Sequence, residues 1–376
     1  MVLILAVVVL IVAVALTDRA RRASSSGTTV LPGLTIDSTI GTIDWTRAAK
    51  AGAKVGRQGE EPETAGAISL AEASKRASEA GVKLDWVTQQ FSLKKPREEY
   101  EALGSGEKAA VLLIEFGNED WPGGNEGGQR HIKEGPERGK TLTGRQYGTK
   151  FIEAAEEGRE HEFPVPLGMQ VQTSSTTGAN AWMRELGELG HAALTEALRP
   201  RSYLPRGNWL VSHPYDGRMT TPLKEPNNPY AYEDTEGNEW GSERWINQQA
   251  LVKEWTGLTV PMAITEYGTA ASPYVSNSSG SWAEVGRHIE DFWAFVRRVQ
   301  KGEVTNAPRG LTPTLALAVY YDEYAWGPYP ITAKSKSEET FGILEVSEGP
   351  GAHPVLGDAN EEGRVYERFR AGVDGL

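Results

Sequence analysis

Two glutamates in this sequence directly follow apolar runs that have the character of buried strands. Glu119 comes after the run 111–116 and the pair Gly117-Asn118, and Glu266 comes after the run 261–265. Two carboxyl groups that face each other over one pocket can cleave a glycosidic bond. One group donates a proton to the leaving oxygen, and the other attacks the sugar carbon or activates a water molecule.

Neither glutamate is distinctive alone, because the chain has 51 acidic residues and many of them must be ordinary solvated loop side chains. Other strand-like runs, however, also end in polar or aromatic residues suited to binding a sugar. These further candidates are Arg57, Gln89, Gln90, Asn118, His213, Tyr215 and Trp326. Gln89 and Gln90 could contact substrate or only fill space. Arg57 could alternatively pair with a nearby carboxylate such as Glu60.

The elements that must position these residues alternate between strand-like and helix-like runs. Expected strands cover 33–37, 53–57, 82–88, 109–116, 165–171, 209–212, 261–265 and 314–321. Expected helices cover 44–51, 69–80, 97–103, 144–158, 179–197, 243–256, 282–299 and 362–371. Eight such repeats predict a (β/α)8 TIM barrel, formed as a single domain by residues 30–376. Active sites of this fold lie at the carboxyl ends of the strands, where the candidate residues fall.

An open, doubly wound sheet that binds a nucleotide is the competing α/β fold. Such a sheet carries Gly-x-Gly-x-x-Gly after its first strand, but residues 38–42 read Ser-Thr-Ile-Gly-Thr. The sequence also contains no Walker phosphate loop. The closed barrel is therefore favoured, and it places the ends of the fourth and seventh strands on opposite sides of one mouth.

Composition narrows the function further. The chain has no cysteine, which excludes disulfides, catalytic thiols and thiolate metal sites. Its six histidines form no His-x-x-x-His pair, so we expect neither a metal nor a cofactor. A net charge of −12 argues against nucleic acid as a partner. Eleven tryptophans could form flat sugar-binding surfaces or simply pack the core.

The first 16 residues form an unbroken apolar run, which three arginines follow within the next six residues. The run is slightly short for a membrane-spanning helix, which needs about 20 residues. We expect residues 1–16 to be a signal peptide or membrane anchor and residues 17–29 to be a linker. The predicted location is extracellular, or anchored to a membrane and facing outward.

The motifs around the two glutamates carry a family resemblance. The run Ile114-Glu115-Phe116-Gly117-Asn118-Glu119 resembles the strand-four signature of the clan A glycoside hydrolases, and Ile264-Thr265-Glu266-Tyr267-Gly268 resembles their strand-seven motif. His213-Pro214-Tyr215 is similar to a His-Pro-Tyr motif of cellulase-like and β-xylosidase-like families in this clan. The resemblance runs in order through the whole barrel, from about residue 33 to residue 326.

The resemblance implies a retaining glycosidase that acts on a β-linked glycan by double displacement, with no metal or cofactor. Glu119 would be the general acid and then the base, and Glu266 would be the nucleophile. The resemblance also implies supporting roles. Asn118 would contact the sugar 2-hydroxyl, and Arg57 would supply a charge that keeps Glu266 ionised. Tyr215 or His213 would hydrogen-bond Glu266, and Trp326 would stack on a sugar ring. We expect a monomer whose partner is an oligosaccharide or polysaccharide.

Some features depart from the clan pattern. Asp120 stands where proline is common, Asp85 is expected inside a strand without an obvious partner, and residues 122–139 form a charged insertion. Two other interpretations therefore stay open. The first is a barrel that binds carbohydrate without cleaving it, and the second is a metal-dependent barrel hydrolase, which would need clustered His and Asp ligands.

Overall fold

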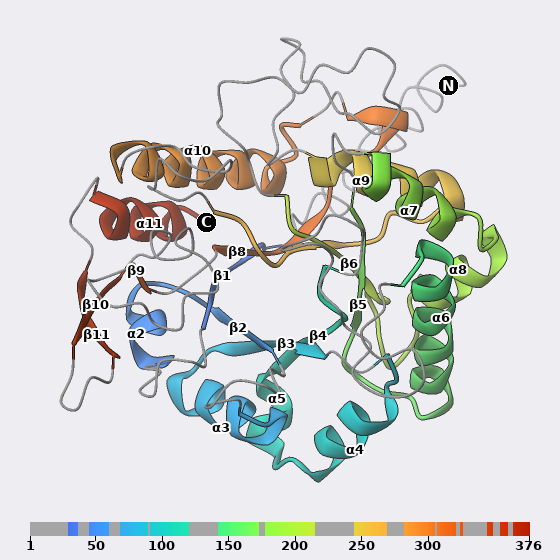
Figure 1. The fold of residues 1–376 in the computed structure, drawn as a ribbon, viewed down its shortest axis with the longest axis horizontal. Coiled ribbons are helices and arrows are strands. Elements are labelled where there is room, and N and C mark those ends of the chain that lie inside the picture. The colour runs from blue at the N-terminus through green and yellow to red at the C-terminus, as the bar shows by residue number, and fades with distance from the viewer. Residues whose placement is uncertain are drawn as a thin grey trace, which may run out of the picture.

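The computed structural model describes residues 29–36, 45–59, 68–88, 91–119, 142–172, 177–214, 244–268, 282–304, 307–320, 324–325, 344–348, 354–359 and 364–376. Eight parallel strands close into a barrel in chain order (Figure 1). They are β1 (Leu31–Thr35), β2 (Val55–Gly59), β3 (Lys83–Thr88), β4 (Val111–Phe116), β5 (Leu167–Gln170), β6 (Trp209–Ser212), β7 (Met262–Ile264) and β8 (Leu315–Tyr320). The closing pair is β1 with β8. The predicted TIM barrel is confirmed.

Side chains alternate across each strand, so every second residue faces the barrel interior. A compact apolar cluster fills part of that interior and includes Val55, Leu113, Val211 and Ala263. Two residues further along the same strands, toward the carboxyl ends, stand Arg57, Glu115, His213 and Thr265. The barrel therefore has an apolar layer with a layer of buried polar residues above it.

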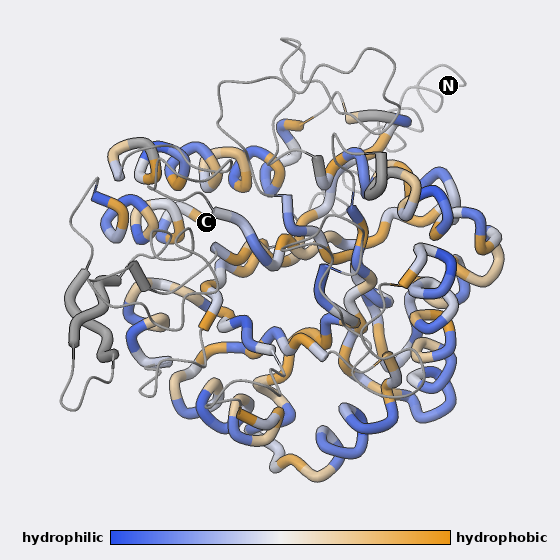
Figure 2. Tube along the Cα trace, in the orientation of Figure 1, coloured by the Kyte–Doolittle hydropathy of each residue, from blue (hydrophilic) through white to orange (hydrophobic). Residues whose placement is uncertain are grey.

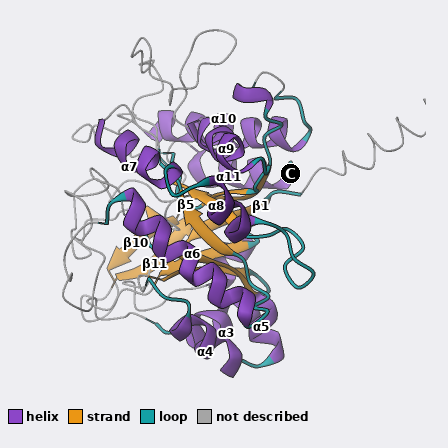
Figure 3. Ribbon diagram, turned by 90° about the vertical axis from the view of Figure 1, so that its right-hand side faces the viewer, coloured by secondary structure: helices purple, strands orange, loops and turns teal. Residues whose placement is uncertain are grey.

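Helices surround the barrel on its sides, as Figures 1 and 3 show. They are α2 (Trp45–Lys50), α3 (Leu70–Ala80), α4 (Lys94–Ala102), α5 (Ser105–Ala110), α6 (Gly144–Glu160), α7 (Thr177–Gly187), α8 (His191–Leu198), α9 (Arg244–Thr256), α10 (Trp282–Gln300) and α11 (Val365–Asp374). Hydrophobic and hydrophilic residues alternate along them, as expected of helices with one buried face (Figure 2). Thr143 and Gln146 form a capping box that fixes the start of α6.

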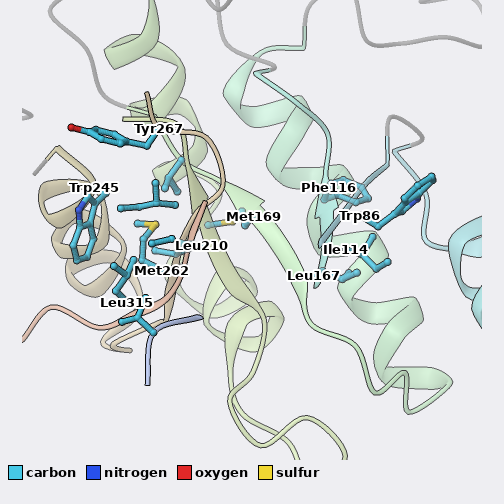
Figure 4. Packing of buried hydrophobic residues seen from close by; sticks show 14 of the residues in the cluster. Trp86, Ile114, Phe116, Leu167, Met169, Leu210, Trp245, Met262, Tyr267 and Leu315 are labelled. Atoms are coloured by element: carbon cyan, nitrogen blue, oxygen red, sulfur yellow. The ribbon is translucent and has the colours of Figure 1, made fainter. Parts of the chain in front are cut away.

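The main core lies between the barrel and these helices (Figure 4). Trp182, Trp245 and Trp293 are among its largest fully buried side chains. Trp45, Trp86 and Trp209 are also buried. Most of the tryptophans in the described part of the chain therefore pack the protein interior and offer no flat surface to a sugar.

One predicted helix is wrong. The run 179–197 was expected to be continuous, but it forms α7 and α8 with a break at residues 188–190. Gly190, the residue directly before α8, has a φ of 98°, which glycine adopts readily and which keeps α7 and α8 from forming one continuous helix. The short helix α5 was not expected, because its last residues, Ala109 and Ala110, were assigned to the following strand.

The region after the barrel contains more than the predicted final helix. Strands β9 (Tyr324–Ala325), β10 (Leu344–Glu348) and β11 (Pro354–Ala359) form a separate three-stranded sheet in the order β11-β10-β9. The expected leader or anchor at 1–16 lies outside the described residues, as does nearly all of the expected linker. Of the helices that the structure describes, none combines the length and the apolar character needed to cross a membrane.

Candidate active site

Arg57 at the carboxyl end of β2 is the centre of the buried polar layer. Its Nε donates to Glu115, and its Nη2 lies 3.3 Å from the other oxygen of the same carboxylate. Nη1 donates to Oε1 of Glu266 at 2.7 Å, and Nη2 donates to Oδ1 of Asn118 at 2.9 Å. One guanidinium therefore joins the ends of β2, β4 and β7, as its five donors in a fixed plane allow. The predicted meeting of Arg57 with Glu266 is present.

A strained turn after β4 presents Glu119 to the mouth. Gly117 has a φ of 85°, and Glu119 itself has a φ of 53°, which is rare for a residue with a side chain. Gln170 of β5 holds this turn from both sides. Its Oε1 accepts from the backbone N–H of Glu119 at 2.7 Å, and its Nε2 donates to the carbonyl of Gly117 at 2.8 Å. Such strain persists where surrounding contacts fix it, most often at functional sites.

The side chains of Glu119 and Glu266 meet over one site. An oxygen of Glu119 and an oxygen of Glu266 lie within 4.8 Å of each other. Each residue is only 5% exposed. The alternative that they are ordinary solvated loop glutamates therefore does not describe either residue.

His213, just after β6, lies between these carboxylates. Its Nδ1 is 3.0 Å from Oε1 of Glu119 and 3.6 Å from Oε2 of Glu266, and its Nε2 is 3.0 Å from Oγ1 of Thr265. Burial alone would lower the pKa of His213, but the charge of Glu266 and the contacts with Glu115 and Glu119 raise it to about 9. The imidazole is therefore a cation at neutral pH and can donate from both nitrogens.

The sequence-based expectation was that His213 or Tyr215 would hydrogen-bond Glu266. The hydrogen bond of His213 in the structure goes to Glu119, and Glu266 is its more distant neighbour. Tyr215, Trp326 and Gln89 lie outside the described residues, so their predicted roles stay predictions. Asn118 lies beside Arg57, as its predicted place near the catalytic pair requires.

Glu115 and Asp85 are fully buried beneath this pair. Burial opposes the charge of Glu115, but Arg57 and His213 outweigh it and lower the pKa of Glu115 to about 2. For Asp85 the direction is opposite. Burial, and next the charge of Glu115, raise the pKa of Asp85 well above its usual value. Glu115 is therefore an anion at neutral pH, and Asp85 is the carboxyl group of the two that holds a proton more readily.

Two aromatic side chains support the site from the helix side. The hydroxyl of Tyr147 on α6 donates to the carbonyl of Phe116 at 2.8 Å and accepts from the N–H of Gln170 at 2.7 Å. Tyr267 follows Glu266 directly, and its hydroxyl lies 2.7 Å from Nε2 of His288 on α10. Tyr267 is 2% exposed, so the segment that carries Glu266 is anchored in the core, as Figure 4 shows for its ring.

Glu119, His213 and Glu266 could together offer three ligand atoms to a metal ion. A metal would need a neutral imidazole and would face Arg57, whose Nη1 lies 2.7 Å from Glu266. A buried guanidinium and a protonated imidazole already balance the carboxylates. The donor set is therefore better matched to a proton and two cationic side chains than to a divalent cation.

Several site residues were not singled out from the sequence. Glu115 stood inside a run regarded only as an apolar strand, although its period-two relation to Leu113 places it on the interior face. Gln170 carried a comparable signal near the end of the fifth strand. The contact of Thr265 with His213 had no signal, because it depends on how β6 and β7 pair.

The fold and this site define a (β/α)8 barrel with two buried glutamates that face each other at the carboxyl ends of its strands. No known family model matches the sequence, and no curated protein matches it. The structure is similar to a β-mannanase of Thermomonospora fusca in complex with mannohexaose, at 12% identity, covering 84% of this chain and 83% of that chain with a TM-score of 0.45.

Two other solved structures are similar to the same degree. An endo-β-1,3-glucanase of Amycolatopsis mediterranei with laminarihexaose is 12% identical, covers 91% of this chain and 99% of that chain, and has a TM-score of 0.44. A β-glucosidase of Exiguobacterium marinum is 13% identical, covers 88% and 86%, and has a TM-score of 0.45. These neighbours are glycoside hydrolases, but likeness at this level assigns no activity to this chain.

Proposed function

We propose that this protein is a retaining glycoside hydrolase of the clan A type, which cleaves the O-glycosidic bonds of a β-linked glycan. The observation that carries the proposal is the closeness of the two carboxyl groups, since one oxygen of Glu119 lies within 4.8 Å of one oxygen of Glu266. Carboxyl groups about 5–5.5 Å apart favour retention, whereas inversion needs about 6.5–9.5 Å to accommodate a water molecule. Glu119 is assigned as the acid/base and Glu266 as the nucleophile.

In the first step, Glu119 gives its proton to the glycosidic oxygen while a carboxylate oxygen of Glu266 attacks the anomeric carbon. The bond from that carbon to the leaving oxygen breaks, and a covalent glycosyl ester with Glu266 forms. We assign the attack to Oε2, since Oε1 of Glu266 is held by Arg57 at 2.7 Å. The leaving alcohol departs with the proton from Glu119.

In the second step, Glu119 acts as a base. It takes a proton from a water molecule, whose oxygen attacks the anomeric carbon and releases Glu266 as a carboxylate. Two displacements at one carbon restore the original configuration. Glu119 ends the cycle protonated, so the site returns to its starting state without a cofactor.

Arg57 and His213 each contact one oxygen of a different carboxyl group. Arg57 donates to Oε1 of Glu266 at 2.7 Å, which places a positive charge beside the nucleophile. His213 donates from Nδ1 to Oε1 of Glu119, so the acidic proton belongs on the other oxygen of that carboxyl group. The proton then faces the substrate and not the imidazole. Asn118, oriented by Arg57, is assigned to the sugar 2-hydroxyl.

The polar lining of the mouth supports an oligosaccharide or polysaccharide as the substrate. Gln172 lies two residues beyond Gln170, the last residue of β5, and is 9% exposed, and its Oε1 meets no hydrogen-bond donor among the described residues. We assign Gln172 to a sugar hydroxyl, and Trp326 to stacking on a sugar ring. We also propose that the enzyme acts as a monomer outside the cell, the location expected from residues 1–16.

The test removes the nucleophile and supplies a substitute. Glu266→Ala should lower kcat on an aryl β-glycoside by more than about 10⁴-fold, and sodium azide should restore turnover and give the glycosyl azide of inverted configuration. Proton NMR of the wild-type reaction should show that the first sugar product retains its configuration. Glu303→Ala, at an exposed position, is the matched control.

The outcome also separates the competing interpretations. A barrel that only binds carbohydrate would show affinity for a glycan without turnover by the wild-type protein. Turnover that Glu266→Ala leaves unchanged, or a first product of inverted configuration, contradicts the assignment.

A further inference from the structure

Two carboxyl groups beneath the catalytic pair touch no substrate in the proposed mechanism. Asp85 on β3 and Glu115 on β4 are both 0% exposed. The β2–β3 register places Arg57 opposite Asp85, and Arg57 donates to both oxygens of Glu115. Three ionisable groups from three adjacent strands are therefore packed together in the buried interior of the barrel.

Their hydrogen bonding requires one additional proton. Within the described residues, neither oxygen of Asp85 meets a hydrogen-bond donor. An ionised carboxylate without donors is very costly to bury. Its neighbour Glu115 is also an acceptor, so two carboxylates cannot bond unless one carries a proton. Because the guanidinium engages both oxygens of Glu115, the proton belongs on Asp85.

We propose that Asp85 and Glu115 hold one proton between them and that this acid–carboxylate pair aims Arg57 at Glu266. Asp85 and Glu115 are then positioning residues, which act through Arg57 and not on the sugar. The sharing of the proton does not depend on the proposed function, whereas the effect on catalysis rests on it. Without the Asp85 proton, Glu115 and Asp85 would compete for the same guanidinium and rotate it away from the nucleophile.

The charged groups around Asp85 support this distribution. Burial, then Glu115 from β4 and Glu266 from the end of β7, raise the pKa of Asp85, while Arg57 from β2 lowers it less strongly. The pKa of Glu115 moves in the opposite direction, because Arg57 and His213 oppose its burial. Two carboxyl groups with separated pKa values are the usual result when such neighbours share one proton.

The first experiment measures stability against pH and needs no catalytic activity. An acid whose pKa is higher in the folded than in the unfolded protein makes the folded state less stable as the pH rises above the unfolded pKa. The wild type should therefore lose stability relative to Asp85→Asn as the pH rises. The ratio of their folding equilibrium constants should change by about tenfold per pH unit, from near pH 4 up to the raised pKa of Asp85. Urea unfolding from pH 5 to pH 8 reads out this change. Asp374→Asn controls for loss of an exposed carboxylate.

The proposal of a shared proton would be overturned if the stability of Asp85→Asn relative to the wild type stayed constant or fell as the pH rises. That result would mean that Asp85 is ionised in the folded state. It would then be a second anionic partner of Arg57, and Asn would remove a favourable charge.

The second experiment tests positioning through kcat. Asp85→Ala removes the donor and should lower kcat by about tenfold or more while KM changes by less than about threefold, because the reacting groups are misaligned. Asp85→Asn keeps a donor and should recover most of the lost kcat. Equal losses in both variants overturn the positioning role. If the wild type cleaves no glycan, the proposed function fails, and the stability experiment still decides the shared proton.

Discussion

Replacing His213 with asparagine tests the electrostatics of the site directly. Asparagine keeps a polar group near the position of Nδ1 but cannot carry the charge that His213 holds between Glu119 and Glu266. The pKa of His213 in the folded protein is about 9, since the charge of Glu266 and the contacts with Glu115 and Glu119 outweigh the effect of burial. An unfolded histidine has a pKa of about 6.5.

The size and sign of the effect follow from these two values. A raised pKa stabilises the folded state fully below about pH 6.5, and this contribution is lost as the pH rises through about 9. The difference corresponds to about 3 kcal/mol. The wild type should therefore be more stable than His213→Asn at pH 6, and most of the charge-dependent part of this advantage should disappear by pH 9.5.

Urea unfolding midpoints between pH 6 and pH 9.5 measure the gap, and His161→Asn, at an exposed position, controls for loss of a surface imidazole. Proton NMR gives a second readout, because the chain has six histidines and the variant lacks one resonance. If that missing resonance titrates at or below pH 6.5 in the wild type, the reasoning about the site charge is wrong.

Three further outcomes are expected. Glu115→Gln should lower the free energy of unfolding by about 3 kcal/mol above pH 4.5, because the pKa of Glu115 in the folded protein is lowered to about 2. This loss should shrink as the pH falls toward 2, and urea unfolding between pH 3 and pH 6 measures it. Gln170→Leu removes both hydrogen bonds to the turn of Glu119 and should lower kcat by about 10²-fold with a smaller change in KM, measured by steady-state kinetics. Dialysis against EDTA should leave kcat unchanged, whereas loss of activity that zinc restores would point to a metal enzyme.

The barrel could be predicted because each strand–helix repeat has its own local signal. The sixth strand was predicted at its observed residues, and the other strands were placed within two residues at each end. The small sheet of β9–β11 was missed. Its strands are short, and β9 pairs with β10 across 20 positions of the sequence (Tyr324 with Leu344), which no local pattern records.

The meeting of Glu119 and Glu266 could be predicted because the strand ends of a barrel converge at one mouth. The particular hydrogen bonds within the site could not be predicted. Which carboxylate His213 bonds is decided by distances of 3.0 Å and 3.6 Å, a difference set by side-chain packing. The Arg57–Glu115 pair depends on the register of three strands. The sequence could therefore predict only that Glu115 faces the barrel interior.

The apolar layer below the active site has a consequence for how protons travel. Val55, Leu113, Val211 and Ala263 carry no side-chain group that can bind or relay a proton, and they occupy the barrel directly beneath Arg57 and Glu115. None of these four side chains can therefore relay hydronium or hydroxide through this layer. Under the proposed mechanism, the protons that Glu119 gains and loses are exchanged on the other side, at the strand ends where the sugar is proposed to bind, so a bound glycan would also control when the acid can be recharged.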